Sequence, residues 1–214
     1  MFDVLEPGFA PDVVPYLAGW ELQRRIHAEV REGRRPETLI LLEHEAVFTA
    51  GSRTQPEDRP RDADTPVIDV DRGGRITWHG PGQLVGYPIM RVADRGDAVA
   101  CVRAIEDMLI EVLRDYGVEG TPIDGRSGVW IERGSGPAAK IAAIGMRVQQ
   151  GVTMHGFALN CDNPLTPFER IVPCGLSDAR TTTMALETGR DLSPRGVKDA
   201  VAGAFRRTFE RIPA

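Results

Sequence analysis

The sequence predicts an α+β or mixed α/β fold, built as a single domain over residues 1–214. Short apolar runs punctuated by glycine and proline follow one another in meander order, which predicts several strands. Amphipathic segments with clear end signals predict helices between and after these strands. No repeat, low-complexity tract or linker divides the chain, and 214 residues suffice for one substantial core.

In the first half of the chain, a helix is expected over residues 12–32, with Gly33 as its end. Its apolar residues recur near helical spacing and are Leu17, Leu22, Ile26 and Val30. Short apolar runs predict strands at residues 39–43, 67–70, 75–78 and 84–90. The segment 51–66 is rich in Arg, Asp, Pro and Thr, which indicates a long surface loop of the kind that often carries function.

In the second half, Asp97 can cap a helix that runs to about residue 116 and that Gly117 can end. Its apolar stripe is formed by Val102, Ile105, Leu109 and Leu113. Residues 128–131 and 140–148 are expected to form a hairpin around a tip at 133–138, followed by a strand at 153–160. Ser193 and Pro194 predict the start of a C-terminal helix that ends near Phe209.

The composition argues against several classes of function. With 26 basic and 31 acidic residues, the net charge of −5 gives no basic footprint for nucleic acid and no polybasic patch for a membrane surface. No apolar run approaches the roughly 18 residues that span a bilayer, and the first residues lack the pattern of a secretory signal. Three widely spaced cysteines argue against a disulfide framework or a zinc site, which indicates a cytosolic protein with reduced thiols.

Lys140 is a candidate for chemistry because the chain has only two lysines, Lys140 and Lys198, against 24 arginines. It lies in the apolar run Ala138-Ala-Lys-Ile-Ala-Ala-Ile-Gly145, where a charged side chain is costly to bury unless it is paired. Lysine, unlike arginine, readily shifts its pKa and gives up a proton. A strand-edge lysine whose ammonium group reaches solvent is the alternative interpretation.

Cys174 follows a proline and precedes a glycine in the segment Ile171-Val-Pro-Cys-Gly-Leu176. A thiol is a useful nucleophile only as a thiolate, and a neighbouring cation such as lysine lowers its pKa. From the residues alone, a catalytic nucleophile and a buried structural cysteine both stay open. Cys101 and Cys161 are interpreted as packing residues.

A glycine-rich segment carries polar groups in the run Arg72-Gly-Gly-Arg-Ile-Thr-Trp-His-Gly-Pro-Gly-Gln-Leu-Val-Gly-Tyr-Pro-Ile89. Glycines permit tight turns and bring backbone N–H groups toward a ligand, while Arg72 supplies a cation and His79 a donor or base. The spacing does not match a phosphate-binding loop. A structural hairpin is the alternative, and His155 and the strand entry Arg126-Ser-Gly-Val-Trp130 are equally ambiguous when taken singly.

Taken together, these motifs resemble one known family. The run 72–89 is followed in order by Gly128-Val-Trp-Ile131, Lys140-Ile-Ala-Ala-Ile-Gly145, His155-Gly-Phe-Ala-Leu-Asn160 and Ile171-Val-Pro-Cys-Gly175. This combination, over roughly residues 14–186, is similar to the octanoyl-[acyl carrier protein]:protein N-octanoyltransferase, or lipoyl(octanoyl) transferase, family. Trp78 stands where an aromatic residue, often tyrosine, is usual in that family.

The resemblance implies the mixed α/β fold shared with lipoate-protein ligases and the biotin protein ligase catalytic domain. It implies that Cys174 carries the acyl group as a thioester, and that Lys140 lowers the pKa of this cysteine and manages the proton. It implies neither a metal nor a cofactor. An apolar channel for the octanoyl chain is expected, with Ile76, Ile144 and Phe157 as candidates. The segments implied to line the acyl substrate comprise Arg72, Gly73, Gly74, Arg75, Ile76, Thr77, Trp78, His79, Ala143, Ile144, Gly145, Gly156, Phe157 and Ala158.

The resemblance also implies the partners of the reaction. Acyl carrier protein would donate the octanoyl group, and the lysine of a lipoyl domain, in a 2-oxoacid dehydrogenase complex or the glycine cleavage H protein, would accept it. This is the first step of protein lipoylation, and we expect a cytoplasmic monomer to catalyse it. The alternatives are an ATP-dependent lipoate or biotin ligase, a non-catalytic binder of acyl carrier or lipoyl domains, and an amidotransferase between lipoyl domains.

Overall fold

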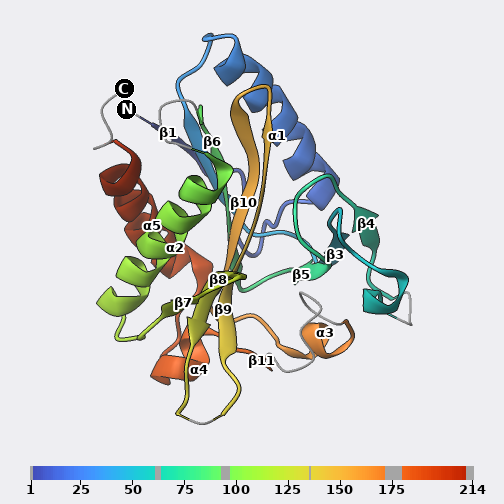
Figure 1. Ribbon diagram of the computed structural model, residues 1–214, viewed down its shortest axis with the longest axis vertical. Helices are drawn as coiled ribbons and strands as arrows, with labels where there is room; N and C mark the ends of the chain where they lie inside the picture. The colour runs from blue at the N-terminus through green and yellow to red at the C-terminus, as the bar shows by residue number, and fades with distance from the viewer. Residues whose placement is uncertain (1, 61–63, 93–96, 135, 172–179, 211–214) are drawn as a thin grey trace.

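The computed structural model describes residues 2–60, 64–92, 97–134, 136–171 and 180–210 (Figure 1). Eight strands of this described part form the larger sheet, in the order β1-β2-β6-β10-β9-β8-β7, with β11 paired to β9. Neighbouring strands are antiparallel except for the parallel pairs β1–β2 and β9–β11. The strands are Asp3–Leu5 (β1), Thr38–Leu42 (β2), Gln83–Ile89 (β6), Thr121–Ile123 (β7), Arg126–Ile131 (β8), Ala139–Gln149 (β9), Val152–Asn160 (β10) and Arg180–Thr181 (β11).

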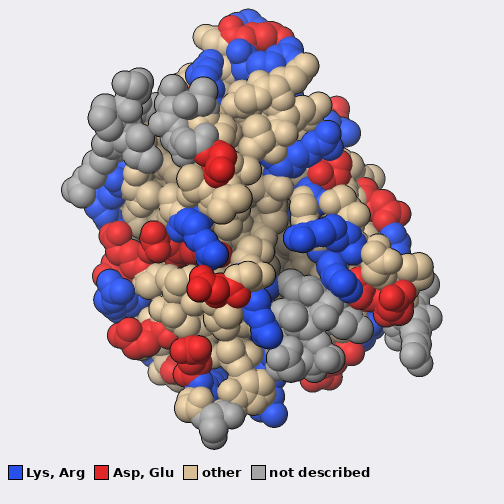
Figure 2. All heavy atoms as spheres, viewed as in Figure 1, with Lys and Arg blue, Asp and Glu red and all other residues tan. Residues whose placement is uncertain are grey.

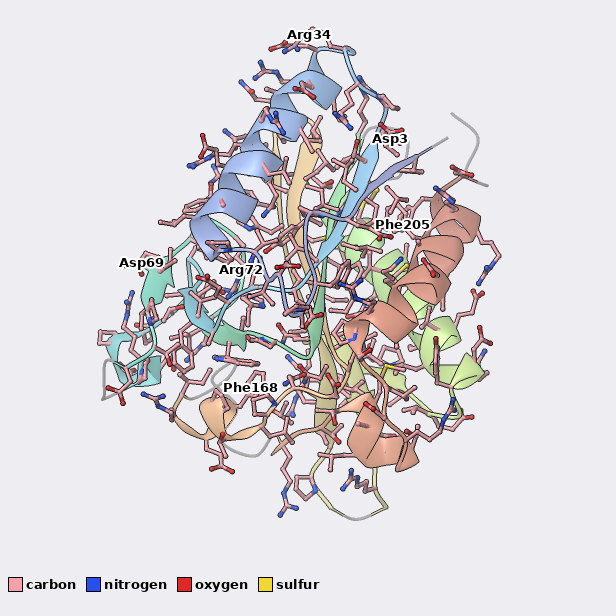
Figure 3. All side chains as sticks on the ribbon, turned by 180° about the vertical axis from the view of Figure 1, so that it is seen from behind. Asp3, Arg34, Asp69, Arg72, Phe168 and Phe205 are labelled. Atoms are coloured by element: carbon pink, nitrogen blue, oxygen red, sulfur yellow. The ribbon has the colours of Figure 1, made fainter. Side chains whose placement is uncertain are left out.

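A smaller sheet has the strand order β4-β3-β5 among the described residues. Its strands are Val47–Ala50 (β3), Val67–Asp69 (β4) and Thr77–His79 (β5). Strand β3 pairs in parallel with β4 and antiparallel with β5. The small sheet lies on the same side of the larger sheet as the first long helix, α1 (Figures 1 and 3).

Helices cover both faces of the larger sheet. Helix α1 (Tyr16–Arg31) packs on β10 and β6, whereas α2 (Ala98–Asp115) and α5 (Pro194–Phe209) pack together on the opposite face (Figure 1). Because successive side chains of a strand point to opposite faces, β2 serves both cores. Leu39 and Leu41 join the cluster of α2 and α5, while Ile40 and Leu42 join that of α1. The remaining short elements are η1 (Pro56–Asp58), α3 (Thr166–Glu169) and α4 (Met184–Thr188).

The predicted end signals of α2 and α5 are confirmed. Asp97 caps α2 by accepting hydrogen bonds from two backbone N–H groups of the first turn, and Gly117 follows its end with a φ of 83°. Ser193 caps α5 by accepting from the backbone N–H of Gly196, and Pro194 occupies the first turn. Every predicted strand is also present, with bounds within two residues of the prediction.

The first helix begins later than predicted, at Tyr16 rather than residue 12. Val14 is extended and forms a parallel bridge with His44, and its backbone N–H donates to the carbonyl of Glu43 at 2.9 Å. Leu17, which the apolar pattern included, is 59% exposed. The buried side of α1 instead consists of Tyr16, Gly19, Gln23, Ile26, His27 and Val30.

Several short elements were not predicted, including β1, β3, β7, β11, α3 and α4. Each has two to five residues, so tertiary pairing rather than a local repeat determines it. Strand β3 lies between the predicted strand 39–43 and the predicted loop 51–66, and that loop itself contains η1. No helix in the described part of the chain is long and apolar enough to cross a membrane.

Candidate functional site

A cavity of about 570 Å³ lies between the small sheet and strands β6, β8, β9 and β10. This volume is within the usual range for small-molecule sites. Its buried wall is apolar and aromatic and includes Ile76, Val85, Tyr87, Ile144, Phe157 and Ala158. Arg72 lies on this side of the larger sheet, whereas Phe205 of α5 lies on the other side (Figure 3).

The cavity brings together most of the residues that sequence analysis assigned to the substrate. These lining residues are Arg72, Gly74, Arg75, Ile76, Thr77, His79, Ala143, Ile144, Gly145, Gly156, Phe157 and Ala158, and Lys140 lines the same cavity. They come from a loop of the small sheet, from β5, and from the paired strands β9 and β10. Segments far apart in the sequence therefore meet at one site.

Gly73 and Trp78 do not line this cavity. Thr77 and His79 of β5 face the cavity, so the alternation of a strand turns Trp78 away from it. The indole of Trp78 instead meets the ring of Phe168 edge-on, with the two centroids 5.7 Å apart. The substrate contacts predicted for these two residues stay a prediction.

Lys140 is half-buried on β9, with its Nζ 4.5 Å from the centroid of the Trp130 ring. Trp130 is its partner in the neighbouring strand β8. On the other side, Lys140 pairs with Thr181 of β11, and its carbonyl accepts a hydrogen bond from Thr182 N–H at 3.0 Å. Lys140 is therefore held within three paired strands rather than at a free edge of the sheet.

The predicted nucleophile, Cys174, lies outside the described residues. Strand β11 begins at Arg180, the sixth residue after Cys174 in the sequence, and pairs directly with the strand that carries Lys140. Cys101, on α2, and Cys161 are both buried in the core between the larger sheet and the helices α2 and α5, which confirms their interpretation as packing residues. Burial raises the pKa of the Cys161 thiol far above its ordinary value.

Arg72 is buried, with an exposed fraction of 7%, and its guanidinium donates to backbone carbonyls and to the Thr49 hydroxyl. It donates to the carbonyl of Thr49 at 2.7 Å, to that of Gly73 at 3.0 Å and to that of Arg75 at 2.9 Å. A Cβ atom at Gly145 would lie 3.2 Å from the Arg72 Cδ, so this glycine allows the arginine to lie close to β9. Arg72 thus fixes the glycine-rich loop against the cavity wall.

His79 is neutral, because burial above all, with smaller contributions from His44 and Arg72, lowers its pKa to about 3. Both ring nitrogens are engaged: Nδ1–H donates to the Gln83 side-chain oxygen at 2.7 Å, and Nε2 accepts from the Thr49 hydroxyl at 3.2 Å. A histidine held in this way is poorly placed to exchange a proton with a substrate. The geometry favours a positioning role for His79.

A chain of buried hydrogen bonds leads from His79 to the strand beside Lys140. The Gln83 amide donates to the Asn160 side-chain oxygen at 2.9 Å, and the Asn160 amide donates to the carbonyl of Thr182 at 3.0 Å. Thr182 in turn donates its N–H to the carbonyl of Lys140. Neither Gln83 nor Asn160 was identified from the sequence as a functional residue, although both belong to the motifs quoted there.

Tyr16, His44 and Tyr87 form an aromatic group at the cavity that sequence analysis did not predict. Tyr16 and Tyr87 line the cavity, and the His44 ring lies 5.0 Å from that of Tyr16. The Tyr87 hydroxyl donates to His44 Nε2 at 2.6 Å, and His44 Nδ1–H donates to the carbonyl of Val14 at 2.8 Å. Burial lowers the pKa of His44 to about 4 and raises the pKa of Tyr16 to about 12, so these groups are neutral near pH 7.

His155 also lines the cavity and has a strained backbone, with a φ of 59° in the left-handed region. Its Nε2–H donates to Asp71 at 2.8 Å, and its backbone N–H donates to the Gln23 side chain at 2.9 Å. Burial lowers the pKa of His155, although the hydrogen bond to Asp71 opposes this effect. Burial alone would raise the pKa of Asp71, but His155 and Arg147 together hold it below its ordinary value.

The sequence of the chain matches the family described as the lipoyl protein ligase A/B catalytic domain over residues 15–206. The chain therefore belongs to this family. Within the family, the chain is 54% identical over 96% of its length to an octanoyltransferase of Renibacterium salmoninarum, covering 88% of that protein. It is 58% identical over 87% of its length to an octanoyltransferase of Salinispora tropica, covering 86% of that protein. The chain is thus a member of the octanoyltransferases, which confirms the predicted family and enzyme class.

Solved structures of more distant proteins share the fold. A lipoate protein ligase of the archaeon Thermoplasma acidophilum superposes with a TM-score of 0.72 at 16% identity, over 97% of this chain and 83% of that one. The biotin protein ligase of Aquifex aeolicus superposes with a TM-score of 0.53 at 12% identity, over 98% of this chain and 68% of that one. These similarities confirm the predicted fold class.

Proposed function

We propose that this chain transfers an octanoyl group from acyl carrier protein to the lysine of a lipoyl domain, through a thioester on Cys174. The lipoyl domain would belong to a 2-oxoacid dehydrogenase complex or be the glycine cleavage H protein. The observation that supports this most strongly is that Lys140, the glycine-rich loop and the paired strands β9 and β10 meet at one cavity. The identity of 54% to an octanoyltransferase makes an octanoyl group the expected cargo.

The reaction proceeds in two acyl transfers. The thiolate of Cys174 attacks the donor carbonyl, a bond from its sulfur to the acyl carbon forms, and the carrier leaves as a thiolate that takes up a proton. The neutral amine of the acceptor lysine then attacks the enzyme thioester, an amide forms, and the Cys174 thiolate is released. The first step exchanges one thioester for another, and the second converts a thioester to a more stable amide. Neither step needs ATP.

Lys140 is the group that carries the proton in this proposal. As an ammonium it favours the thiolate of Cys174 by its charge, and it can protonate the departing carrier thiolate. As an amine it can then take a proton from the acceptor nitrogen during the second transfer. The pairing of β11 with β9 supports this role, since Thr181, seven residues after Cys174 in the sequence, is the strand partner of Lys140.

The octanoyl chain would lie against the apolar wall formed by Ile76, Ile144 and Phe157, as sequence analysis expected. Burying an alkyl chain is favourable by about 0.8 kcal/mol for each methylene group, so this wall would hold the acyl group firmly. Gly86 leaves the space for the Phe157 ring, because a Cβ there would lie 2.1 Å from the ring. Monomeric state and cytoplasmic location stay predictions.

The proposal is tested by the intact mass of the protein after incubation with octanoyl-acyl carrier protein. One added octanoyl group that is absent in Cys174→Ser, and that is lost when a lipoyl domain is added, is the expected result. No adduct in a preparation that still octanoylates the lipoyl domain would overturn the thioester mechanism. Transfer by Cys174→Ala that consumes ATP would point instead to an adenylate-forming ligase.

A further inference from the structure

The charged side chains that line the cavity are all basic. They comprise four arginines and one lysine, namely Arg53, Arg72, Arg75, Arg126 and Lys140, and no aspartate or glutamate accompanies them among the described residues. The whole chain has a net charge of −5, so this concentration of positive charge runs against its overall balance. A cavity with such a lining favours an anionic ligand group.

The basic residues divide into an interior set and a rim set. Arg72 is buried and satisfied by carbonyl oxygens, and Lys140 lies over Trp130. Arg53 is exposed, and Arg75 and Arg126 are half-exposed, so these three stand where the cavity opens. Figure 2 shows this face of the molecule with Lys and Arg side chains on both sides of a central hollow.

Arg53 presents its charge on a fixed loop. Its backbone N–H donates to the carbonyl of Gly74 at 3.0 Å, and the preceding Ser52 N–H donates to the carbonyl of Arg72 at 3.0 Å. The guanidinium of Arg53 makes no hydrogen bond or ion pair with any residue that the structure describes. Its charge is therefore available to a ligand without breaking a contact with those residues.

The other two arginines of the rim, Arg75 and Arg126, also line the cavity and can add their charge to that of Arg53. Arg75 shares its charge with Asp58, whose carboxylate oxygens lie 3.2 and 3.3 Å from Nη1. The guanidinium of Arg126, the first residue of β8, lies 5.8 Å from the centroid of the Trp130 ring and lines the same cavity as Arg53. The guanidinium fork matches the geometry of phosphate oxygens, which makes arginine the side chain of choice for such an anion.

We propose that Arg53, assisted by Arg75 and Arg126, binds the phosphate of the pantetheine arm that joins the octanoyl group to its carrier. The inference rests on the proposed function, because neither the octanoyl chain nor the acceptor lysine offers a negative charge. The acyl end of the donor belongs at the apolar wall inside the cavity. The phosphate, at the opposite end of the arm, then belongs at the basic rim.

The test uses two non-transferable donor analogues as inhibitors of octanoyl transfer from intact acyl carrier protein. They are S-octyl-4′-phosphopantetheine and S-octyl-pantetheine, which differ only in the phosphate. We expect the phosphorylated analogue to inhibit the natural protein about tenfold more tightly, the factor that corresponds to about 1.4 kcal/mol. Arg53→Gln is expected to lose most of this preference and to raise the KM for the carrier donor, with little change in kcat.

Arg206→Gln serves as the matched control, because Arg206 is an exposed arginine of α5 on the opposite face of the sheet and the variant loses the same charge. It should keep the preference of the natural protein. Equal inhibition by the two analogues in the natural protein, or an unchanged preference in Arg53→Gln, would overturn the inference. If Arg53→Gln raised the KM for the carrier but left the preference for the phosphorylated analogue unchanged, Arg53 would instead contact an acidic surface of the carrier protein. Failure of the natural protein to transfer octanoyl from the intact carrier would overturn the proposed function itself.

Discussion

Lys140 and Trp130 face each other across the β8–β9 pair, with the lysine Nζ 4.5 Å from the centroid of the indole ring. The face of an aromatic ring attracts a cation, an effect of about 0.5–2 kcal/mol that grows when water is excluded. Trp130 is fully buried, so it offers this face at a fixed position. The pair explains how a half-buried lysine is accommodated within an apolar strand and directed at the cavity.

Lys140→Arg is expected to fold and to transfer octanoyl at least about a hundredfold more slowly, the lower end of the range that general acid–base catalysis contributes. Arginine can retain the contact with the Trp130 ring, but it does not give up its proton. The measurement is kcat for octanoyl transfer alongside the thermal midpoint of unfolding. Near-normal turnover would reduce Lys140 to a purely electrostatic role.

Asn160→Ala is expected to lower both stability and kcat. The change leaves the Gln83 amide and the Thr182 carbonyl without their buried partner, which costs about 1–3 kcal/mol. For a chain of this length, that loss corresponds to a fall of several degrees in the thermal midpoint. Because Thr182 also holds the backbone of Lys140, we expect kcat to fall several-fold more than KM rises.

A purely structural role for Asn160 would change the folded fraction and leave the pH profile of kcat per folded molecule as it was. We expect that pH profile to shift, because Thr182, which donates to the Lys140 carbonyl, loses its hydrogen bond from Asn160. Thr121→Val is a suitable control, because among the described residues its hydroxyl donates only to the next carbonyl on β7, and Thr121 does not line the cavity. An Asn160→Ala protein with unchanged kcat at every pH would contradict the positioning role.

The sequence predicted the strands and helices well where a local pattern suffices, and it identified Lys140 because lysine is so rare in this chain. It could not predict Tyr16, His44 and Tyr87 as one group, because a helix start, a bridge and a central strand meet there only after folding. Trp78 was assigned to the substrate because the family resemblance implied the whole run 72–79, whereas the alternation of β5 turns its side chain away from the cavity toward Phe168. Arg53 was missed because a loop side chain has no periodic signal.

The stability of the protein is expected to fall as the pH drops from about 6.5 toward 4. Burial lowers the pKa of His44 to about 4 and that of His79 to about 3. Below pH 6.5 the unfolded chain takes up protons that the folded chain cannot accept, so each of these histidines removes up to about 1.4 kcal/mol for each pH unit. Above pH 6.5 neither state carries these protons, and the two histidines no longer affect the pH dependence.

Urea unfolding at pH 7.5, 6.0, 5.0 and 4.5 measures this slope. His79→Asn removes one of the titrating groups, so its free energy of unfolding should start lower but decline less steeply over the same range. Asp71, whose pKa is lowered, adds a loss of stability only at more acidic pH, so it does not mask the effect. A free energy of unfolding that stays constant between pH 7.5 and 5.0 would contradict the burial of neutral histidines.

Gly156→Ala is expected to destabilise the protein by more than about 2 kcal/mol, within the range of overpacking a core. A Cβ at Gly156 would lie 2.2 Å from the carbonyl oxygen of Gly86 and 2.5 Å from Pro88, so the central pair β6–β10 would have to separate. Gly203→Ala is the matched control on α5, where the nearest atom is the flexible end of Arg207 at 3.4 Å. Because alanine favours a helix by about 0.5–1 kcal/mol over glycine, this control should leave stability equal or higher. Equal midpoints for the two variants would mean that β6 and β10 can separate without cost, and that the close strand contact behind the cavity does not shape it.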